Sequence, residues 1–317
     1  MLSFLKKVFI DAPVERTKRV YFWCFNFVGM RLSFLYIPYY YLYVRRHLRI
    51  GKDGRVGMMQ VSSLIARGCN LRCEFCTTFG AYRKGVIPAD ELIESYVKWR
   101  KKLKPRFFIL SGGEPLLHPE LERIVRESAK IWNDSKLWLG TNGLLLHSVK
   151  PEVLRALKET GFELFVTEHT FDLEHRKKLD AGYARLKQEK IPFVVRPSRL
   201  TWIQKYQYRQ IGGFAPFDSD PKKALYHCKH SDCTTIHGDQ MYKCAYLLSV
   251  RLMTEAGVFD ANLWKAGLAY SPPTFQSTAE EILEHLSSQD VPACAVCPDK
   301  KNIVLAHQLP VQNRLQI

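Results

Sequence analysis

The chain has 317 residues, enough for one large hydrophobic core and a smaller appended unit, and its composition excludes a disordered protein. Its formal net charge of +16 favours anionic partners such as nucleic acid, acidic lipid headgroups or phosphorylated substrates. Nine cysteines in mostly clustered positions, with no cleavable signal pattern at Met1, argue against a secreted disulfide protein and predict the reducing cytoplasm.

Residues 1–56 are predicted to form a basic, aromatic, helical extension. They hold 13 of the 39 aromatic residues, and eleven Lys and Arg against three acids. Asn26, Arg31 and Pro38 interrupt the apolar run, so the sequence does not favour a membrane-spanning helix. We expect a helical cap packed over the rest of the chain. The alternatives are a helix in peripheral contact with a membrane interface and an RNA-binding arm.

From residue 57 onward, after a glycine-punctuated linker, predicted strands and helices alternate. Strands are expected at Met59–Ala66, Phe107–Leu110, Lys136–Leu139, Phe162–Thr167 and Pro192–Arg196. Helices are expected at Pro88–Leu103, His118–Trp132, Pro151–Glu159 and Leu173–Lys187, and Thr201–Gly213 is expected to hold a sixth strand and a short helix. This order predicts an α/β fold, a partial (β/α)6-type TIM barrel over residues 57–215. Active sites of such barrels lie at the C-terminal ends of the strands.

A cysteine motif follows the first of these strands. Cys69, Cys73 and Cys76 have the spacing C-x3-C-x2-C. Three soft thiolates can hold three irons of a [4Fe–4S] cluster and leave the fourth iron open. A structural zinc site would need a fourth ligand, and no further Cys or His lies nearby in the sequence. Two more motifs, Ser111-Gly112-Gly113-Glu114-Pro115 and Thr141-Asn142-Gly143, follow the next two strands.

These three motifs together resemble the radical S-adenosylmethionine (SAM) enzymes, over the range from about Val61 to Arg196. The resemblance implies that SAM binds the open iron and is cleaved reductively to a 5′-deoxyadenosyl radical, which abstracts hydrogen from a substrate. It also implies cofactor-binding residues: Phe75 at the adenine, the backbone of Gly112, Gly113 and the Glu114 region at the amino group, Asn142 in the strand-end segment, and Thr167 with Arg196, or Arg176 instead, at the carboxylate.

Residues 216–317 carry five further cysteines, at positions 228, 233, 244, 294 and 297. Gly238–Cys244 is predicted to form a hairpin, and a helix is expected near Ala279–Leu286. The segment resembles the shortened auxiliary-cluster domain called Twitch, a relative of SPASM, although five residues instead of four separate Gly238 from Cys244.

The Twitch resemblance implies one auxiliary [4Fe–4S] cluster, with Cys233, Cys244, Cys294 and Cys297 as ligands. Cys228 is then left over as a candidate catalytic hydrogen donor. Two alternatives for Cys228 are a buried small apolar residue and a ligand in place of Cys233. A structural zinc site is the alternative to the cluster, because paired cysteines at these spacings also suit zinc.

We therefore expect a radical SAM enzyme that abstracts hydrogen from a small polar metabolite, sugar-like or phosphorylated, for oxidation or epimerisation. An electron donor such as flavodoxin or ferredoxin is the expected partner. The alternatives are a maturase of ribosomally made peptides, an RNA-modifying enzyme, and a non-enzymatic electron-transfer or iron-sensing protein. Residues 1–56 are too short and too aromatic for the usual leader-binding domain of a maturase, and nucleic acid is not the expected partner.

Overall fold

The computed structural model describes residues 45–169, 173–197, 202–209, 213–228, 233–300 and 303–304. Its contacts separate Met1–Leu48 from a second unit, Arg49–Ile317. Of the first unit, the described part includes one short 3-10 turn, η3 (Arg45–His47), so the predicted helical extension lies outside the described residues. Among the helices of the described residues, none is both long enough and apolar enough to cross a bilayer.

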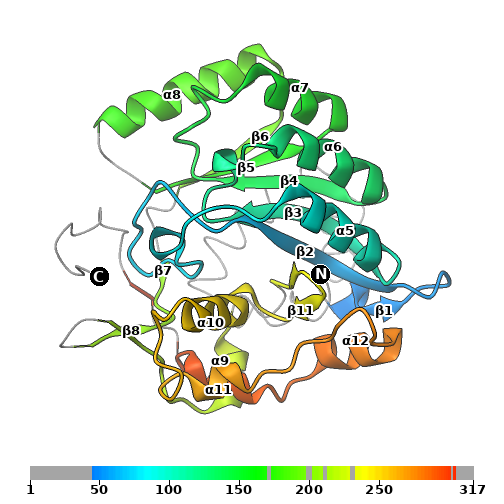
Figure 1. Ribbon diagram of the computed structural model, residues 1–317, viewed down its shortest axis with the longest axis vertical. Helices are drawn as coiled ribbons and strands as arrows, with labels where there is room; N and C mark the ends of the chain where they lie inside the picture. The colour runs from blue at the N-terminus through cyan, green and yellow to red at the C-terminus, as the bar shows by residue number, and fades with distance from the viewer. Residues whose placement is uncertain are drawn as a thin grey trace, which may run out of the picture. The chain divides into compact units, whose positions relative to one another are not determined.

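The second unit is built on one sheet with the strand order β11-β10-β2-β3-β4-β5-β6. The strands are β2 (Val56–Ala66), β3 (Leu103–Gly112), β4 (Lys136–Thr141), β5 (Glu163–Glu168), β6 (Phe193–Pro197), β10 (Thr235–His237) and β11 (Gln240–Tyr242). The connecting helices are α5 (Ala89–Arg100), α6 (Leu121–Ile131), α7 (Pro151–Thr160) and α8 (Leu173–Gln188). Strands β2 to β6 are parallel, and α5, α6 and α7 lie side by side along the sheet (Figure 1). The predicted α/β fold is confirmed.

Alternation of apolar residues explains why the sheet buries one face against these helices. In β4 and β5, every second residue is buried. Val61, Leu110, Leu139 and Leu164 are all fully buried. Pro151 starts α7 and Gly161, with φ of 71°, ends it, as a proline at the first turn and a glycine at the C-terminus favour.

The structure differs from the sequence-based expectation at the edges of the sheet. The linker was predicted at Gly51–Gly57. Its first part, Gly51 to Arg55, is a turn that joins β1 (Arg49–Ile50) to β2 as antiparallel neighbours, and Val56 and Gly57 belong to β2. Residues 202–209 and 213, the described part of Thr201–Gly213, do not supply the sixth parallel strand. That strand is β10, which pairs with β2 through Thr235 opposite Ser62. A long-range pairing of this kind leaves no local signal in the sequence.

The described part of Thr201–Gly213 forms short strands that stand apart from the main sheet. Two small sheets pair β7 (Trp202–Ile203) with β12 (Ile303–Val304), and β8 (Gln207–Tyr208) with β9 (Phe214–Ala215). The remaining elements are η4 (Gly80–Tyr82), η5 (Pro115–Leu117), α9 (Pro221–His227), α10 (Ala245–Glu255), α11 (Lys265–Leu268), α12 (Ala279–Ser287) and η6 (Pro292–Val296).

Residues 216–300 continue the main sheet through β10 and β11 and then form a helical layer around a second apolar core (Figure 1). The predicted hairpin and the predicted helix near Ala279–Leu286 are confirmed by β10–β11 and α12. Thr278 and Glu281 cap α12 reciprocally, which fixes where it begins. Contacts keep Arg49–Ile317 as a single unit, so the boundary expected between residues 215 and 216 falls inside it.

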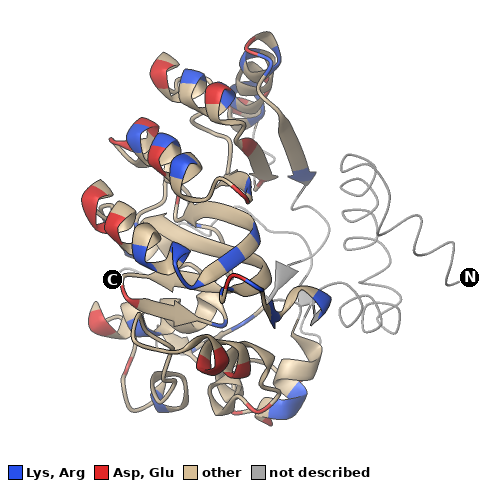
Figure 2. Cartoon of the chain, turned by 90° about the vertical axis from the view of Figure 1, so that its right-hand side faces the viewer, with Lys and Arg blue, Asp and Glu red and all other residues tan. Residues whose placement is uncertain are grey.

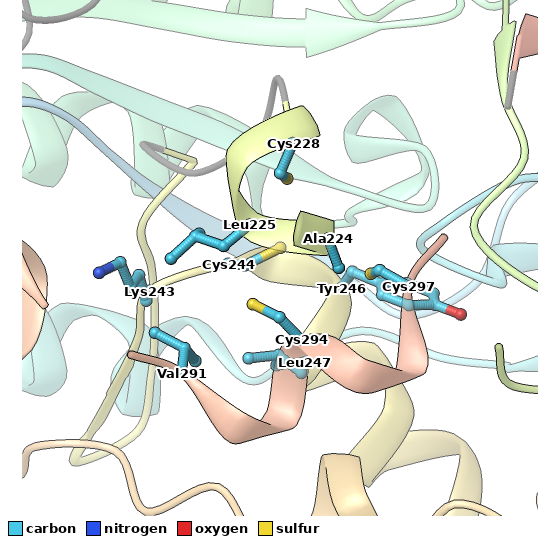
Figure 3. A pocket seen from close by; sticks show the side chains of 10 residues that line it. All are labelled: Ala224, Leu225, Cys228, Lys243, Cys244, Tyr246, Leu247, Val291, Cys294 and Cys297. Carbon is cyan, nitrogen blue, oxygen red and sulfur yellow. The ribbon is translucent and has the colours of Figure 1, made fainter. Parts of the chain in front are cut away.

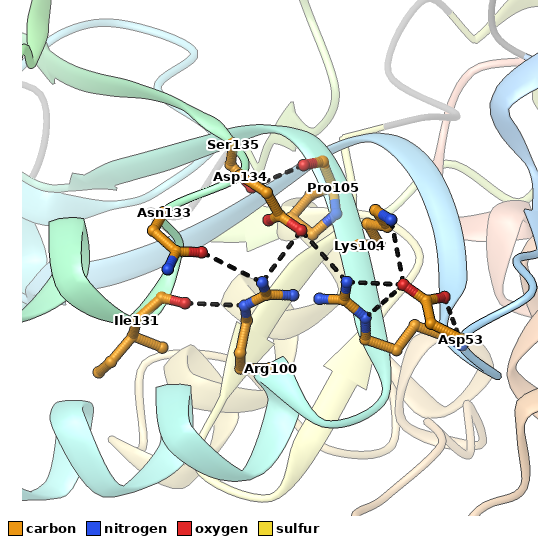
Figure 4. A network of polar contacts seen from close by, with 9 residues as sticks. Asp53, Arg100, Lys104, Pro105, Ile131, Asn133, Asp134 and Ser135 are labelled. Carbon is orange, nitrogen blue, oxygen red and sulfur yellow. Dashed lines mark hydrogen bonds and ion pairs between the residues drawn. The ribbon is translucent and has the colours of Figure 1, made fainter.

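A charged network ties together the loops at the N-terminal ends of β2, β3 and β4 (Figure 4). Asp53 accepts from Arg55 (2.7 Å) and Lys104 (3.0 Å), and Asp134 pairs with Arg55 (3.2 Å) and Arg100 (3.0 Å). The hydrogen bonds from Arg55 and Lys104 hold the Asp53 pKa well below its usual value. Since the cysteine motif lies at the other end of β2, this network steadies the sheet away from the candidate site.

The outer helices carry acidic and basic side chains interleaved (Figure 2). Pairs such as Lys98–Glu94 and Arg126–Glu122 lie one helical turn apart. Exposed pairs of this kind contribute about 0–1 kcal/mol each and mainly keep the helices solvated.

Candidate active site

Cys69, Cys73 and Cys76 lie on the loop that leaves β2 at its C-terminal end. The Cys69 N–H donates to Gly80 O (3.0 Å) and the Cys76 N–H to Cys73 O (3.3 Å), so the loop is held by its own backbone. Burial raises the pKa of Cys69 to about 11 and also raises the pKa of Cys73. Thiols that resist ionisation in the bare protein need a bound cation to become ligands, and iron supplies that charge.

The side chain of Arg83 also indicates that the cysteine loop suits an iron–sulfur cluster. Its Nε and Nη1 are buried and have no hydrogen-bond partner, while Nη2 donates to Thr78 O. Desolvation lowers the Arg83 pKa to about 10, and the charge of Cys76 acts in the opposite direction. Two buried, unpaired donors beside a cysteine loop suit an anionic cluster, because they would otherwise remain unsatisfied.

Within the described residues, no three His, Cys, Asp or Glu side chains converge tightly enough to hold a single metal ion. A [4Fe–4S] cluster does not require such convergence, since each thiolate binds a different iron. Three cysteines at this spacing fit three irons of a cluster whose fourth iron stays open.

Two glycines bring the end of β3 against this loop. The Gly113 N–H donates to Ala66 O (2.8 Å), and a Cβ on Gly113 would lie 2.0 Å from Gly68 O. Gly112 has φ of 149°, a conformation that other residues rarely adopt. Backbone packing thus requires both glycines. The SAM contact expected for Gly112 and Gly113 stays a prediction.

Glu114 joins the two remaining motifs. Its fully buried carboxylate accepts hydrogen bonds from the Leu116 N–H (3.0 Å), the Thr141 hydroxyl (2.7 Å) and the Asn142 N–H (2.8 Å). Burial raises the pKa of Glu114, and these three bonds oppose the rise. Protein donors already occupy the carboxylate, so Glu114 fixes the positions of the two turns.

Asn142 continues this connection to the cysteine loop. Its side chain is 7% exposed, donates to Asn70 Oδ1 (2.7 Å), and has Nδ2 3.8 Å from Cys69 Sγ. The Leu144 N–H donates back to Asn142 Oδ1 (3.0 Å). The structure thus brings the three motifs of the sequence into one connected site at the C-terminal ends of β2, β3 and β4.

Thr167 and Arg196, expected at the SAM carboxylate, lie directly opposite one another on β5 and β6. The alternative, Arg176, pairs with the buried Glu168 (2.9 Å), which also accepts from the Tyr183 hydroxyl (2.9 Å). Arg176 also pairs with Asp180 on α8, and the choice between Arg176 and Arg196 stays open. Both cofactor roles stay predictions.

Phe75 packs against two tyrosines that the sequence analysis did not consider. Its ring centroid lies 5.7 Å from that of Tyr206 and 5.6 Å from that of Tyr208, and its φ is 55°. These contacts join the cysteine loop to β8 and to the residue directly before it. The adenine contact expected for Phe75 stays a prediction.

A second group of cysteines surrounds a small cavity of about 20 Å³ (Figure 3). Cys228 ends α9, Cys244 precedes α10, Cys294 lies in η6 and Cys297 follows η6. Burial raises the pKa of Cys297 to about 12 and raises the pKa values of Cys244 and Cys294. Burial therefore favours the neutral form of these three thiols, and a bound cation would be needed to make them thiolate ligands.

Cys233 is not among the residues that line this cavity. Gln60 Nε2 donates to its sulfur (3.6 Å), because Cys233 lies two residues before β10 and β10 pairs with β2. Its carbonyl accepts from the Ala245 N–H (3.2 Å), beside Cys244. The expected ligand set included Cys233, with Cys228 as the alternative in its place. Cys228 lines the cavity, and which of the two binds a cluster stays a prediction.

Residues 63–188 match the family model described as the radical SAM superfamily. Residues 63–188 therefore form a radical SAM domain, as the three motifs predicted. The cofactors of this domain are a [4Fe–4S] cluster and SAM.

Among named proteins, the chain is 39% identical over 151 residues to the "GTP 3′,8-cyclase" of Aquifex aeolicus. It is 44% identical over 92 residues to the "GTP 3′,8-cyclase" of Microcystis aeruginosa. The matches cover 46% and 27% of this chain, and 46% and 28% of the two relatives. The chain thus spans less than half the length of each of these relatives.

Two solved structures show a distant likeness. BtrN, in complex with AdoMet and 2-DOIA, aligns with 77% of this chain and 92% of its own, at 13% identity and a TM-score of 0.45. Streptococcus suis SuiB, bound to its precursor peptide SuiA, aligns with 81% of this chain and 74% of its own, at 10% identity and a TM-score of 0.37.

Proposed function

We propose that this protein is a radical SAM enzyme that oxidises a small phosphorylated metabolite. Cys69, Cys73 and Cys76 hold the SAM-binding [4Fe–4S] cluster, whose role when bound is to deliver the electron that cleaves SAM. A second [4Fe–4S] cluster lies in the cavity between α9, α10 and η6. Its ligands are Cys228, Cys244, Cys294 and Cys297.

The observation that carries this proposal is the gathering of four cysteines from three separate segments around one cavity. Four thiolates satisfy all four irons of a cube, so no iron remains open for a substrate atom. Such a centre suits electron transfer, and oxidation of a substrate after hydrogen abstraction releases one more electron. Cys228 as a ligand is no longer a hydrogen donor, which disfavours epimerisation.

The proposal that the substrate is phosphorylated rests on two weaker observations. The named relatives carry GTP, a nucleoside triphosphate, in their names, although they match less than half of this chain. The net charge of +16 also favours an anionic ligand. A peptide and an RNA substrate remain as alternatives that turnover assays with each class would reveal.

A structural zinc site is the rival for the four-cysteine cavity, because four cysteines also suit tetrahedral zinc. A matched pair of variants, Cys228→Ala and Cys233→Ala, separates the possibilities when anaerobic protein is analysed for iron and zinc. We expect about eight irons in the natural protein and after Cys233→Ala, and about four after Cys228→Ala. Stoichiometric zinc with about four irons in the natural protein would refute the second cluster.

The SAM chemistry is tested separately. Chemically reduced protein should convert SAM to 5′-deoxyadenosine and methionine, and the triple variant with Cys69, Cys73 and Cys76 changed to Ala should not. Absence of cleavage by iron-replete natural protein, with and without candidate phosphorylated substrates, would overturn the proposed function.

A further inference from the structure

Lys205 is a buried lysine whose ammonium group lies beside Cys228, one of the four cysteines that line the cavity. Only 3% of the residue is exposed, and its Nζ lies 3.4 Å from Cys228 Sγ, within hydrogen-bonding distance of a sulfur. The Tyr246 hydroxyl donates to the Lys205 carbonyl (2.9 Å), which fixes the backbone at this position. Tyr246 itself lines the cavity and is fully buried apart from 2% of its surface.

Three cysteines of the cavity, Cys228, Cys297 and Cys244, lie near the Lys205 ammonium group. An ammonium group is costly to bury unless negative charge compensates it. Thiolates bound to a cluster would supply that compensation, so the position of Lys205 makes sense in the presence of an anionic centre.

A second buried lysine at the same cavity provides a contrast. Lys243 lines the cavity and is 4% exposed, but its Nζ donates to the carbonyl groups of Ser288 and His285, the latter at 3.4 Å. These bonds direct Lys243 toward the end of α12. Lys205 is the lysine whose ammonium group approaches a cysteine sulfur.

We propose that Lys205 sets the reduction potential of the auxiliary cluster by placing a fixed positive charge and a hydrogen bond at Cys228. The inference rests on the proposed second cluster. A [4Fe–4S] centre with four thiolates gains one negative charge when it takes up one electron, and no bond is formed or broken. A neighbouring cation stabilises the more negative form, so Lys205 raises the potential and makes the centre a better electron acceptor.

The test uses the full chain with Cys69, Cys73 and Cys76 changed to Ala, so that only the auxiliary cluster remains. Lys205→Met and Lys205→Gln remove the charge, and Lys205→Arg keeps it. Lys222→Met is the matched control, because the Lys222 side chain lies on α9 in the same region and is 71% exposed. Iron content is measured first, and the potential is then determined by anaerobic redox titration followed by electron paramagnetic resonance.

We expect about four irons in every protein. At a fixed potential, the ratio of reduced to oxidised cluster should fall at least tenfold in Lys205→Met, which equals a shift of about 59 mV for one electron. Lys205→Gln should shift the same way, while Lys205→Arg and Lys222→Met should stay near the parent.

An unchanged potential in a four-iron Lys205→Met protein would overturn the assignment while leaving the cluster itself intact. Loss of iron from both uncharged variants, but not from Lys205→Arg, would also overturn it and make Lys205 a residue needed for cluster assembly. Absence of iron from the parent triple variant would instead refute the auxiliary cluster, so the two failures are distinguishable.

Discussion

Replacing Glu114 by Gln should destabilise the site far more than its small change in size suggests. The carboxylate accepts three hydrogen bonds in a fully buried setting. In Gln, an NH2 group replaces one carboxylate oxygen, so it meets an N–H or O–H donor instead of accepting from it. One buried N–H is then left without an acceptor, at a cost of about 1–3 kcal/mol. The other two bonds lose their charge assistance, about 1 kcal/mol each. Because the neutral side chain avoids the desolvation that raises the Glu114 pKa, part of this loss is recovered.

The net expectation is a loss of about 2–4 kcal/mol in the free energy of unfolding, or a fall of roughly 5–15 °C in Tm. Thermal and denaturant unfolding of Glu114→Gln measure it. The matched control is Glu91→Gln at an exposed position of α5, which should change the stability by less than about 0.5 kcal/mol. A loss below about 1 kcal/mol for Glu114→Gln would refute the reasoning, since it would mean that the carboxyl group is already neutral in the folded protein.

Three further expectations follow from particular contacts. Gly113→Ala should cost at least about 3 kcal/mol, because its Cβ would press on the Gly68 carbonyl oxygen, whereas Gly140→Ala, whose nearest atom would be 3.8 Å away, should be nearly neutral by the same unfolding assay. Arg83→Met should leave iron-free protein as stable as before, since two unpaired donors are removed, but should speed the loss of iron from the loaded protein; equal effects on both forms would contradict this. Burial lowers the pKa of His285 to about 4 in the folded protein. Between pH 6.5 and about 4, His285 is therefore protonated in the unfolded chain and neutral in the folded chain. Stability should therefore fall by about 1–2 kcal/mol as the pH drops from 6.5 toward 4, after allowance for partial exposure, and a flat profile in both the natural protein and His285→Gln would refute the assignment.

The first site could be predicted from the sequence because its signals are local. Cys69, Cys73 and Cys76 share one loop, and each of the other two motifs directly follows a strand with a clear apolar pattern. Parallel strands place their C-terminal ends on one edge, so the meeting of the motifs follows from the order of the elements. The bonds that join them, from Glu114 to Asn142 and from Asn142 to Asn70, had no signal in the sequence.

The second site could be predicted only in part, because its geometry depends on the pairing of β10 with β2. That pairing holds Cys233 beside Gln60 and leaves Cys228, at the end of α9, to face Cys244 and Cys294. Cys228 follows helix α9. Asp220 caps the start of this helix, because its side chain accepts hydrogen bonds from two backbone N–H groups. The Asp220-Pro221 helix start is the local signal for the position of Cys228, and the sequence left the choice between Cys228 and Cys233 open.

The segment from Lys205 to Tyr208 gives the two cysteine sites a common boundary. Lys205 reaches Cys228, while the next residue, Tyr206, and Tyr208 pack against Phe75 in the first cysteine loop. Tyr206 is also 5.0 Å from Phe79 between ring centroids, inside the apolar core that α10 completes. Because backbone bonds join these positions directly, a shift at either cysteine site must be transmitted to this segment or absorbed within it. In the proposed reaction, an electron leaves the substrate near the first cysteine loop and is accepted at the four-cysteine cavity. The packed rings of Phe75, Tyr206 and Tyr208 exclude water from the side of this segment that meets the first loop.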